Sequence, residues 1–208
     1  TGGTASVTFD VAGGTINSNS AFSGGIAINH AGTSTLGAAL DSDNGITITS
    51  GELDVSASNY GITTGNWTDA GSGTFNERSG TVTFDLAGGS IISNEAFNNV
   101  TINHAGTSTL GASLDLDDTL TITGGALDVS GSNYGITLKS WTDTGAGTFT
   151  EGTGTVTFDI TGGTINSNET FENVTINHAG TTTLGAALDL DDTLTITGGA
   201  LDVSGSNY

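Results

Sequence analysis

The chain has 208 residues, a formal net charge of −20 at neutral pH, two basic residues (Arg78 and Lys139) and no cysteine, proline or methionine. This charge excludes a nucleic-acid-binding protein, because neutralising phosphates needs clustered lysine and arginine. It also disfavours an anionic membrane surface. The lack of cysteine excludes disulfides, and no apolar run reaches the ~18 residues of a membrane-inserted span.

The sequence is a tandem repeat with a period of about 74 residues. Val7-Thr8-Phe9-Asp10 returns as Val82-Thr83-Phe84-Asp85 and as Val156-Thr157-Phe158-Asp159. Residues 80–134 and 154–208 differ at eight of 55 aligned positions. We assign repeat 1 to residues 1–79, repeat 2 to 80–153 and a truncated repeat 3 to 154–208, all in one continuous solenoid. The last residue, Tyr208, stops where Gly-Ile-Thr follows Tyr60 and Tyr134, so we expect the array to continue.

Within repeat 2 the strand-like segments have a shorter period. Predicted strands start at Val82, Val100, Leu120 and near Trp141, roughly 18 to 21 residues apart. A turn rich in Gly, Asn or Asp follows each one, and a second strand then follows at Ile91, Leu110, Leu127 and Phe149. Strict alternation predicts that Leu120 and Ile122 face inward, and that Thr119, Thr121 and Thr123 face outward.

These features predict an all-β fold, a parallel β-solenoid with about four coils of about 18 residues in each repeat and two or three short strands in each coil. Inward Val, Ile, Leu, Phe and Trp would stack in ladders, and outward Thr, Asn and Asp would face water. Coils ~4.8 Å apart give roughly 19 Å of rod for each repeat. The alternative is a string of tandem Ig-like β-sandwich domains, since about 74 residues can just make one sandwich. The short period and the lack of linkers between units favour the solenoid.

Four recurring motifs are distributed along the whole chain and are most complete at residues 80–153. They are Gly-Thr-Val-Thr-Phe-Asp, Asn-Val-Thr-Ile-Asn, Leu-Thr-Ile-Thr-Gly-Gly-Ala-Leu-Asp-Val and Trp-Thr-Asp-Thr-Gly-Ala-Gly-Thr-Phe. The sequence resembles the repeat regions of very large microbial surface proteins, the filamentous-haemagglutinin-like or autotransporter-like β-helical adhesins and stalks. The resemblance implies an extracellular spacer, adhesive rod or filament wall, and it implies no catalytic motif.

An acidic run is the candidate metal site. Asp115-Leu116-Asp117-Asp118 recurs at residues 189–192, and alternation would turn Leu116 inward and Asp115 and Asp117 outward. Paired carboxylates suit Ca²⁺, although the run matches no known calcium loop and a solvated acidic turn is the alternative. The predicted ligands are Asp115, Asp117, Asp118, Asp189, Asp191 and Asp192. Otherwise we expect no cofactor.

Three histidines, His30, His104 and His178, occupy Ile-Asn-His-Ala-Gly turns. One repeat apart, they would stand ~19 Å from one another along the rod, too far to share a zinc ion. We therefore expect each histidine to form hydrogen bonds to the backbone of its own turn.

Two surface features allow other functions. Outward threonines suggest an ice-binding solenoid as a remote alternative, although Asn99, Asn103 and Asp85 would interrupt the rows. Exposed aromatic residues would favour a glycan- or receptor-binding module. The candidate aromatic residues are Trp67, Trp141, Tyr60, Tyr134 and Tyr208. Asn66, Asn99, Asn168 and Asn173 begin Asn-x-Thr glycosylation motifs.

The sequence as a whole predicts a non-catalytic, structural segment of a long extracellular repeat protein at a microbial surface. Every candidate group recurs with the repeat, whereas an active site needs one asymmetric cluster, so we expect no enzymatic activity. Uncapped strand edges predict self-association end to end or into filaments. Surface glycans are possible partners of the alternative binding module, and neither nucleic acid nor a membrane is expected as a partner.

Overall fold

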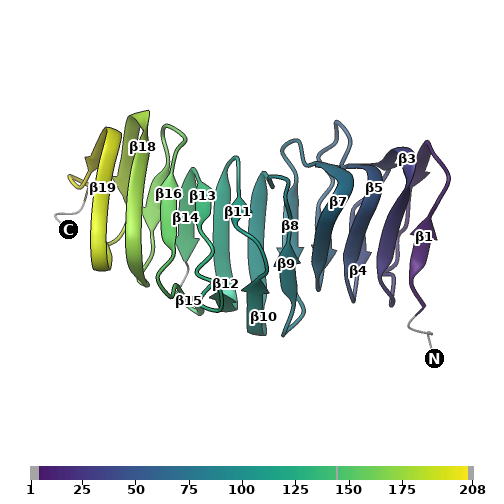
Figure 1. Ribbon diagram of the computed structural model, residues 1–208, viewed down its shortest axis with the longest axis horizontal. Helices are drawn as coiled ribbons and strands as arrows, with labels where there is room; N and C mark the ends of the chain where they lie inside the picture. Colours follow the sequence, from purple (N-terminus) through teal and green to yellow (C-terminus); the bar gives the residue numbers. More distant parts are fainter. Residues whose placement is uncertain (1–4, 144, 206–208) are drawn as a thin grey trace.

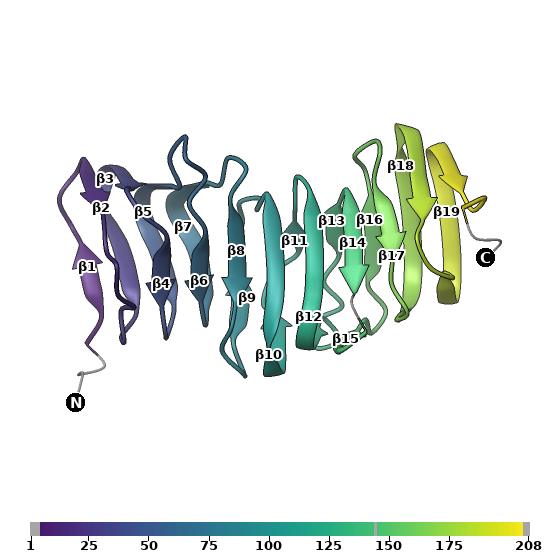
Figure 2. The ribbon, with the colours of Figure 1, turned by 180° about the vertical axis from the view of Figure 1, so that it is seen from behind.

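A computed structural model describes residues 5–143 and 145–205 of the chain. These residues form a rod of stacked coils with the N- and C-terminal ends at opposite ends of the rod (Figures 1 and 2). The described part of the chain contains strands and no helix. The strands are β1 (Val7–Phe9), β2 (Gly14–Ile16), β3 (Ile26–Leu36), β4 (Leu40–Ser42), β5 (Ile46–Asp54), β6 (Ile62–Thr64), β7 (Trp67–Asn76), β8 (Thr81–Phe84), β9 (Ser90–Ile92), β10 (Asn99–Leu110), β11 (Leu114–Asp115), β12 (Thr119–Asp128), β13 (Ile136–Leu138), β14 (Ser140–Asp143), β15 (Gly147–Thr150), β16 (Thr155–Phe158), β17 (Thr164–Asn166), β18 (Thr170–Leu184) and β19 (Asp189–Asp202).

Every pairing between these strands is parallel, which confirms the predicted β-solenoid and rules out the antiparallel Ig-like alternative. The pairings form three columns along the rod. The first column contains β4, β6, β8, the start of β10, the start of β12, β14 and β17. The second runs from β1 through the starts of β3, β5 and β7 to β9 and β15. The third begins with β2 and later contains β11, β13, β16 and the middle of β18.

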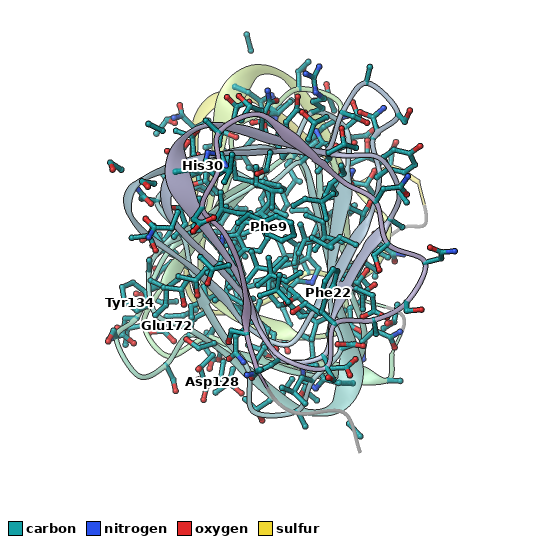
Figure 3. The ribbon with its side chains drawn as sticks, turned by 90° about the vertical axis from the view of Figure 1, so that its right-hand side faces the viewer. Phe9, Phe22, His30, Asp128, Tyr134 and Glu172 are labelled. Atoms are coloured by element: carbon teal, nitrogen blue, oxygen red, sulfur yellow. The ribbon has the colours of Figure 1, made fainter. Side chains whose placement is uncertain are left out.

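Alternation along each strand separates the core from the surface. Leu120 and Ile122 are fully buried, whereas Thr119, Thr121 and Thr123 are half-exposed, as the sequence predicts. Inward side chains stack coil on coil into one apolar core that extends from Ile16 to Leu184. Seen from the N-terminal end, Phe9 and Phe22 lie within the outline of the coil, and Asp128, Tyr134 and Glu172 lie at its edge (Figure 3). The core and the backbone ladder are therefore continuous across the repeat boundaries.

Most coils are longer than the sequence predicts. The coil that begins at Val82 closes at Val100, as expected, but the coil that begins at Trp67 closes only at Ile91. Both coils contain three segments, so the difference lies in the lengths of the connections between the segments. The sequence prediction omitted the segment that contains Leu114 and β11, and the segment that contains β13.

The repeat is out of phase with the coil. Repeat 2 contains eleven segments, which occupy the three columns in turn. Because three segments make one coil, one repeat completes three coils and two thirds of a fourth, close to the predicted four. Its Val-Thr-Phe strand, β8, lies in the first column, whereas the same strand is in the second column in repeat 1 (β1) and in the third in repeat 3 (β16). The segments are residues 82–84, 90–92, 97, 100–102, 108–110, 114–116, 120–122, 126–128, 136–138, 141–143 and 147–150. Each repeat is therefore turned by a third of a circle relative to the previous one.

Disulfide trapping tests this phase, because the chain has no cysteine of its own. Thr137 and Thr157 are register partners in the third column, so their Cα atoms are ~4.8 Å apart and a disulfide can form. We expect Thr137→Cys/Thr157→Cys to oxidise readily without loss of stability. Thr142 lies in the first column, so the control Thr142→Cys/Thr157→Cys should stay reduced. Cross-linking of the control pair, and not of the first, would contradict the assigned phase.

Candidate functional site

The tryptophans lie in the core and not on the surface. Trp67 and Trp141 are each 0% exposed. Trp67 packs edge-on against Phe75 and Phe97, with ring centroids 4.7 and 5.1 Å apart. Such buried rings cannot stack on a glycan, so the binding-module alternative loses its two tryptophans. Trp141 makes the same contacts with Phe149 and Phe171 in the next repeat.

The tyrosines give the binding module little more surface. Tyr60 and Tyr134 are half-buried and pack against the core. Tyr208 lies outside the described residues. The aromatic residues therefore contribute chiefly to stability in the part of the chain that the structure describes.

Each histidine forms hydrogen bonds within its own turn, as the sequence predicts. In repeat 2 the backbone N–H of Gly106 donates to Nδ1 of His104 at 3.0 Å, and Nε2 lies 2.8 Å from Oγ of Ser108. Because Nδ1 accepts, Nε2 carries the proton and donates to the serine. Burial lowers the pKa of His104, against a smaller raising effect of Asp85. His30 and His178 repeat this geometry at the other two corners of the rod.

The coil above each histidine turn approaches it closely. Gly125 has a φ of 77°, and a Cβ atom there would lie 2.5 Å from the carbonyl oxygen of His104 and 2.7 Å from that of Gly106. This glycine thus meets two requirements, a left-handed backbone and close contact with the neighbouring coil. Gly51 and Gly199 stand in the same positions above His30 and His178.

Comparing alanine substitutions at Gly125 and Gly88 should separate the cost of the left-handed backbone from the cost of the steric clash. Gly125→Ala combines left-handed strain with a steric clash, so we expect it to lower the free energy of unfolding by about 3 kcal/mol or more. Gly88 has a φ of 84° and no atom within 4 Å of the place that a methyl group would occupy, so Gly88→Ala should cost only about 1 kcal/mol. Urea denaturation measures both values. Equal losses in the two variants would contradict the close approach of the coils.

The acidic runs begin on strand segments, where Asp115 is the register partner of Thr137 and Asp189 that of Thr170, and they have the predicted orientation in repeat 2. Asp115 and Asp117 are exposed and Leu116 is buried between them. Asp118 is ion-paired with Lys139, whose Nζ lies 3.2 Å from Oδ1. In repeat 3, Asp189, Asp191 and Asp192 are exposed on the last described coil. The described residues contain no group of three His, Cys, Asp or Glu side chains placed to hold a metal ion, and calcium binding by these runs stays a prediction.

Like charges nevertheless gather around these runs. Asp115 is exposed, yet partial desolvation of its carboxylate, and then the carboxylates of Asp159 and Asp117, raise its pKa. Asp41, its copy in repeat 1, has its pKa raised by burial and by Asp43 and Asp85. The runs are thus strongly acidic surface patches that attract cations in general.

Outward threonines form longer rows than the sequence indicates. Thr63, Thr83, Thr101, Thr121 and Thr142 are successive register partners in the first column. Asn99 does not interrupt this row, because it lies in the neighbouring one, beside Thr81 and Thr119. The row ends at Asp41 and at Asn166. A second row in the third column consists of Thr137, Thr157, Thr175 and Thr195.

The glycosylation motifs differ in accessibility. Nδ2 of Asn66 donates to the carbonyl of Asn44 at 2.7 Å, and its Oδ1 accepts from the backbone N–H of Ser90 at 2.9 Å. Asn99 is engaged in a similar way by its neighbours. Asn168 is exposed and Asn173 is half-exposed. Modification of all four residues stays a prediction, and Asn168 is the most accessible of them.

Three buried acidic residues are absent from the sequence-based candidates, and two of them, unlike Asp54, have no basic partner. Asp69 and Asp143 follow the tryptophans by two positions, and they are only 1% and 6% exposed. The signal was present in the alternation: a residue two positions after an inward tryptophan on the same strand also points inward. Burial, and then the carboxylate of Glu95, raise the pKa of Asp69 from 3.8 to about 6, against a small lowering by the nearby backbone N–H of Gly71.

This raised pKa predicts a pH dependence of stability. The folded state disfavours the ionised form of Asp69. As far as this residue is concerned, the free energy of unfolding should therefore be highest below about pH 4, fall as the pH rises to about 6, and stay constant above that. The loss should be about 2–3 kcal/mol. Asp69→Asn should remove this loss. Histidine titration changes the free energy of unfolding in the opposite direction, but it is common to both proteins, so the difference between wild type and variant reports Asp69 alone. If the free energy of unfolding changed by the same amount in both proteins between about pH 4 and about pH 7, the assignment would be wrong.

No protein-family model, no curated protein and no solved structure matches the chain. Among the described residues no helix is long and apolar enough to cross a membrane.

Proposed function

We propose that the chain is a structural, non-catalytic segment of a long extracellular repeat protein, serving as a stalk, filament or adhesin rod at a microbial surface. The observation that carries this proposal is the unbroken core and parallel ladder, which run through all three repeats. A repeated sequence in such an architecture adds length without adding a new kind of site. The resemblance to filamentous-haemagglutinin-like and autotransporter-like repeats supports the extracellular setting.

The surface supports a spacer more than a binding module. The tryptophans are buried, and the groups that remain exposed are mostly Thr, Asn, Asp and Gly. Shallow hollows between coils of the first repeat are lined by residues such as Asn44, Thr47, Asn66 and Thr68. The threonine rows leave the remote ice-binding alternative in place, although the row in the first column is bounded by Asp41 and Asn166.

The same architecture supports self-association end to end as part of the proposal. The last described strand, β19, pairs with β18 on one side, and its side chains Leu194 and Ile196 are 39% and 47% exposed. The unpaired backbone N–H and C=O groups of such an edge can form hydrogen bonds with the strands of a further coil. A further repeat of the array, or a second copy of the chain, would cover it.

Chains with different numbers of repeats test the spacer function. Electron micrographs should show straight rods that lengthen by about 18 Å with each added repeat, with an axial spacing near ~4.8 Å in their power spectra. A glycan array should give no signal above that of an unrelated acidic protein. Lengths that do not scale with repeat number would contradict the spacer, and specific glycan binding would favour the adhesive module.

A further inference from the structure

The first two repeats each bury an aspartate that has no positively charged partner. Neither carboxylate oxygen of Asp69 has a well-formed hydrogen bond among the described residues, and the backbone N–H of Gly71 lies only near enough to lower its pKa in part. In Asp143, Oδ1 accepts from the backbone N–H of Gly145 at 2.9 Å, whereas the buried Oδ2 has no partner there. The chain's two basic side chains are ion-paired elsewhere, Arg78 with Asp54 and Lys139 with Asp118. A buried carboxylate in this setting lacks a counter-charge from the protein.

A second carboxylate, from the next coil at the start of repeat 2, lies at the same corner as Asp69. The register pairs Thr68 with Ile92, which places Ser93 beside Asp69. Oγ of Ser93 accepts from the backbone N–H of Glu95 at 3.2 Å and donates to its carbonyl at 3.0 Å, which fixes the turn that carries Glu95. Glu95 is near enough to Asp69 for its charge to raise the pKa of that carboxyl.

Repeat 2 has the same arrangement at a different corner. Asp143 and Glu169 are separated along the chain by the same interval as Asp69 and Glu95. Oγ of Ser167 accepts from the backbone N–H of Glu169 at 3.1 Å. Oε2 of Glu169 accepts from the backbone N–H of Phe149 at 3.1 Å, so this side chain reaches back to β15, the strand that follows Asp143 in the preceding coil.

We infer that each of these corners binds one divalent cation of the Ca²⁺ type, between Asp69 of repeat 1 and Glu95 of repeat 2, and between Asp143 of repeat 2 and Glu169 of repeat 3. Carboxylates are the preferred ligands of such ions, and main-chain and water oxygens complete the coordination. The bound ion supplies the missing positive charge and ties two successive coils together. The indole N–H groups of Trp67 and Trp141 are donors and cannot serve as ligands.

The site differs from the acidic runs at residues 115–118 and 189–192, and matched variants separate the two. Asp69→Asn/Asp143→Asn and the control Asp117→Asn/Asp191→Asn each remove two carboxylates. In metal-free buffer near neutral pH, Ca²⁺ should raise the melting temperature of the wild type by several degrees. The control should keep this rise and the first variant should lose it. Tb³⁺ should give luminescence excited through the adjacent tryptophans, at two ions per chain, in the wild type and the control only.

Three results would overturn the inference. They are a wild-type melting temperature that Ca²⁺ does not change, a response lost in the control and kept in Asp69→Asn/Asp143→Asn, and a Tb³⁺ signal that survives in that variant. If Ca²⁺ does not change the wild-type melting temperature, and metal-free Asp69→Asn/Asp143→Asn melts at a higher temperature than the metal-free wild type, the two aspartates are held as neutral acids. If that variant fails to fold, Glu95→Gln/Glu169→Gln replaces it, because both glutamates are half-exposed.

Discussion

The parallel hydrogen-bond ladder between successive coils is the constraint on which the rest of the structure depends. It fixes the coil spacing at ~4.8 Å, and with that spacing it places each side chain directly over its register partner. Inward positions must then accept the same kind of group in every coil, which is why Val82, Val100, Leu120 and Trp141 succeed one another in one column. Outward positions obey the same rule and produce the threonine rows.

The ladder also determines where polar groups can enter the interior. Along the straight segments the inward positions are apolar, and the exceptions are concentrated near the corners. Asp54 is one of them: it is 8% exposed, and the Arg78 guanidinium, at 2.6 and 2.8 Å, holds the pKa of this carboxyl below its usual range. Asp69 has no such partner, and its pKa shifts in the opposite direction. The two residues show how much a buried acid depends on a counter-charge at its corner.

Alternation and period were sufficient to predict the solenoid, the inward Leu120 and Ile122, and the hydrogen-bonded histidine turns. The coil length was predicted less well, because short segments such as Leu114–Asp115 carry too few residues to display a period. The phase between repeat and coil depends on which segments pair, and that information is not local. Asp69 was overlooked because an aspartate in a strand is ordinarily read as a surface residue, although its position two residues after Trp67 placed it inside.

The phase has a mechanical consequence for a rod. The coils are unequal, since the one from Trp67 to Ile91 contains more residues than the one from Val82 to Val100, and an unequal coil tilts the stack toward one side. If each repeat completed a whole number of coils, every tilt would fall on the same side and the rod would curve. A rotation of a third of a turn per repeat instead distributes each irregularity over three sides, so the tilts cancel over three repeats. Eleven segments on three columns therefore favour a straight rod, and they give all three faces of a long array the same sequence of side chains.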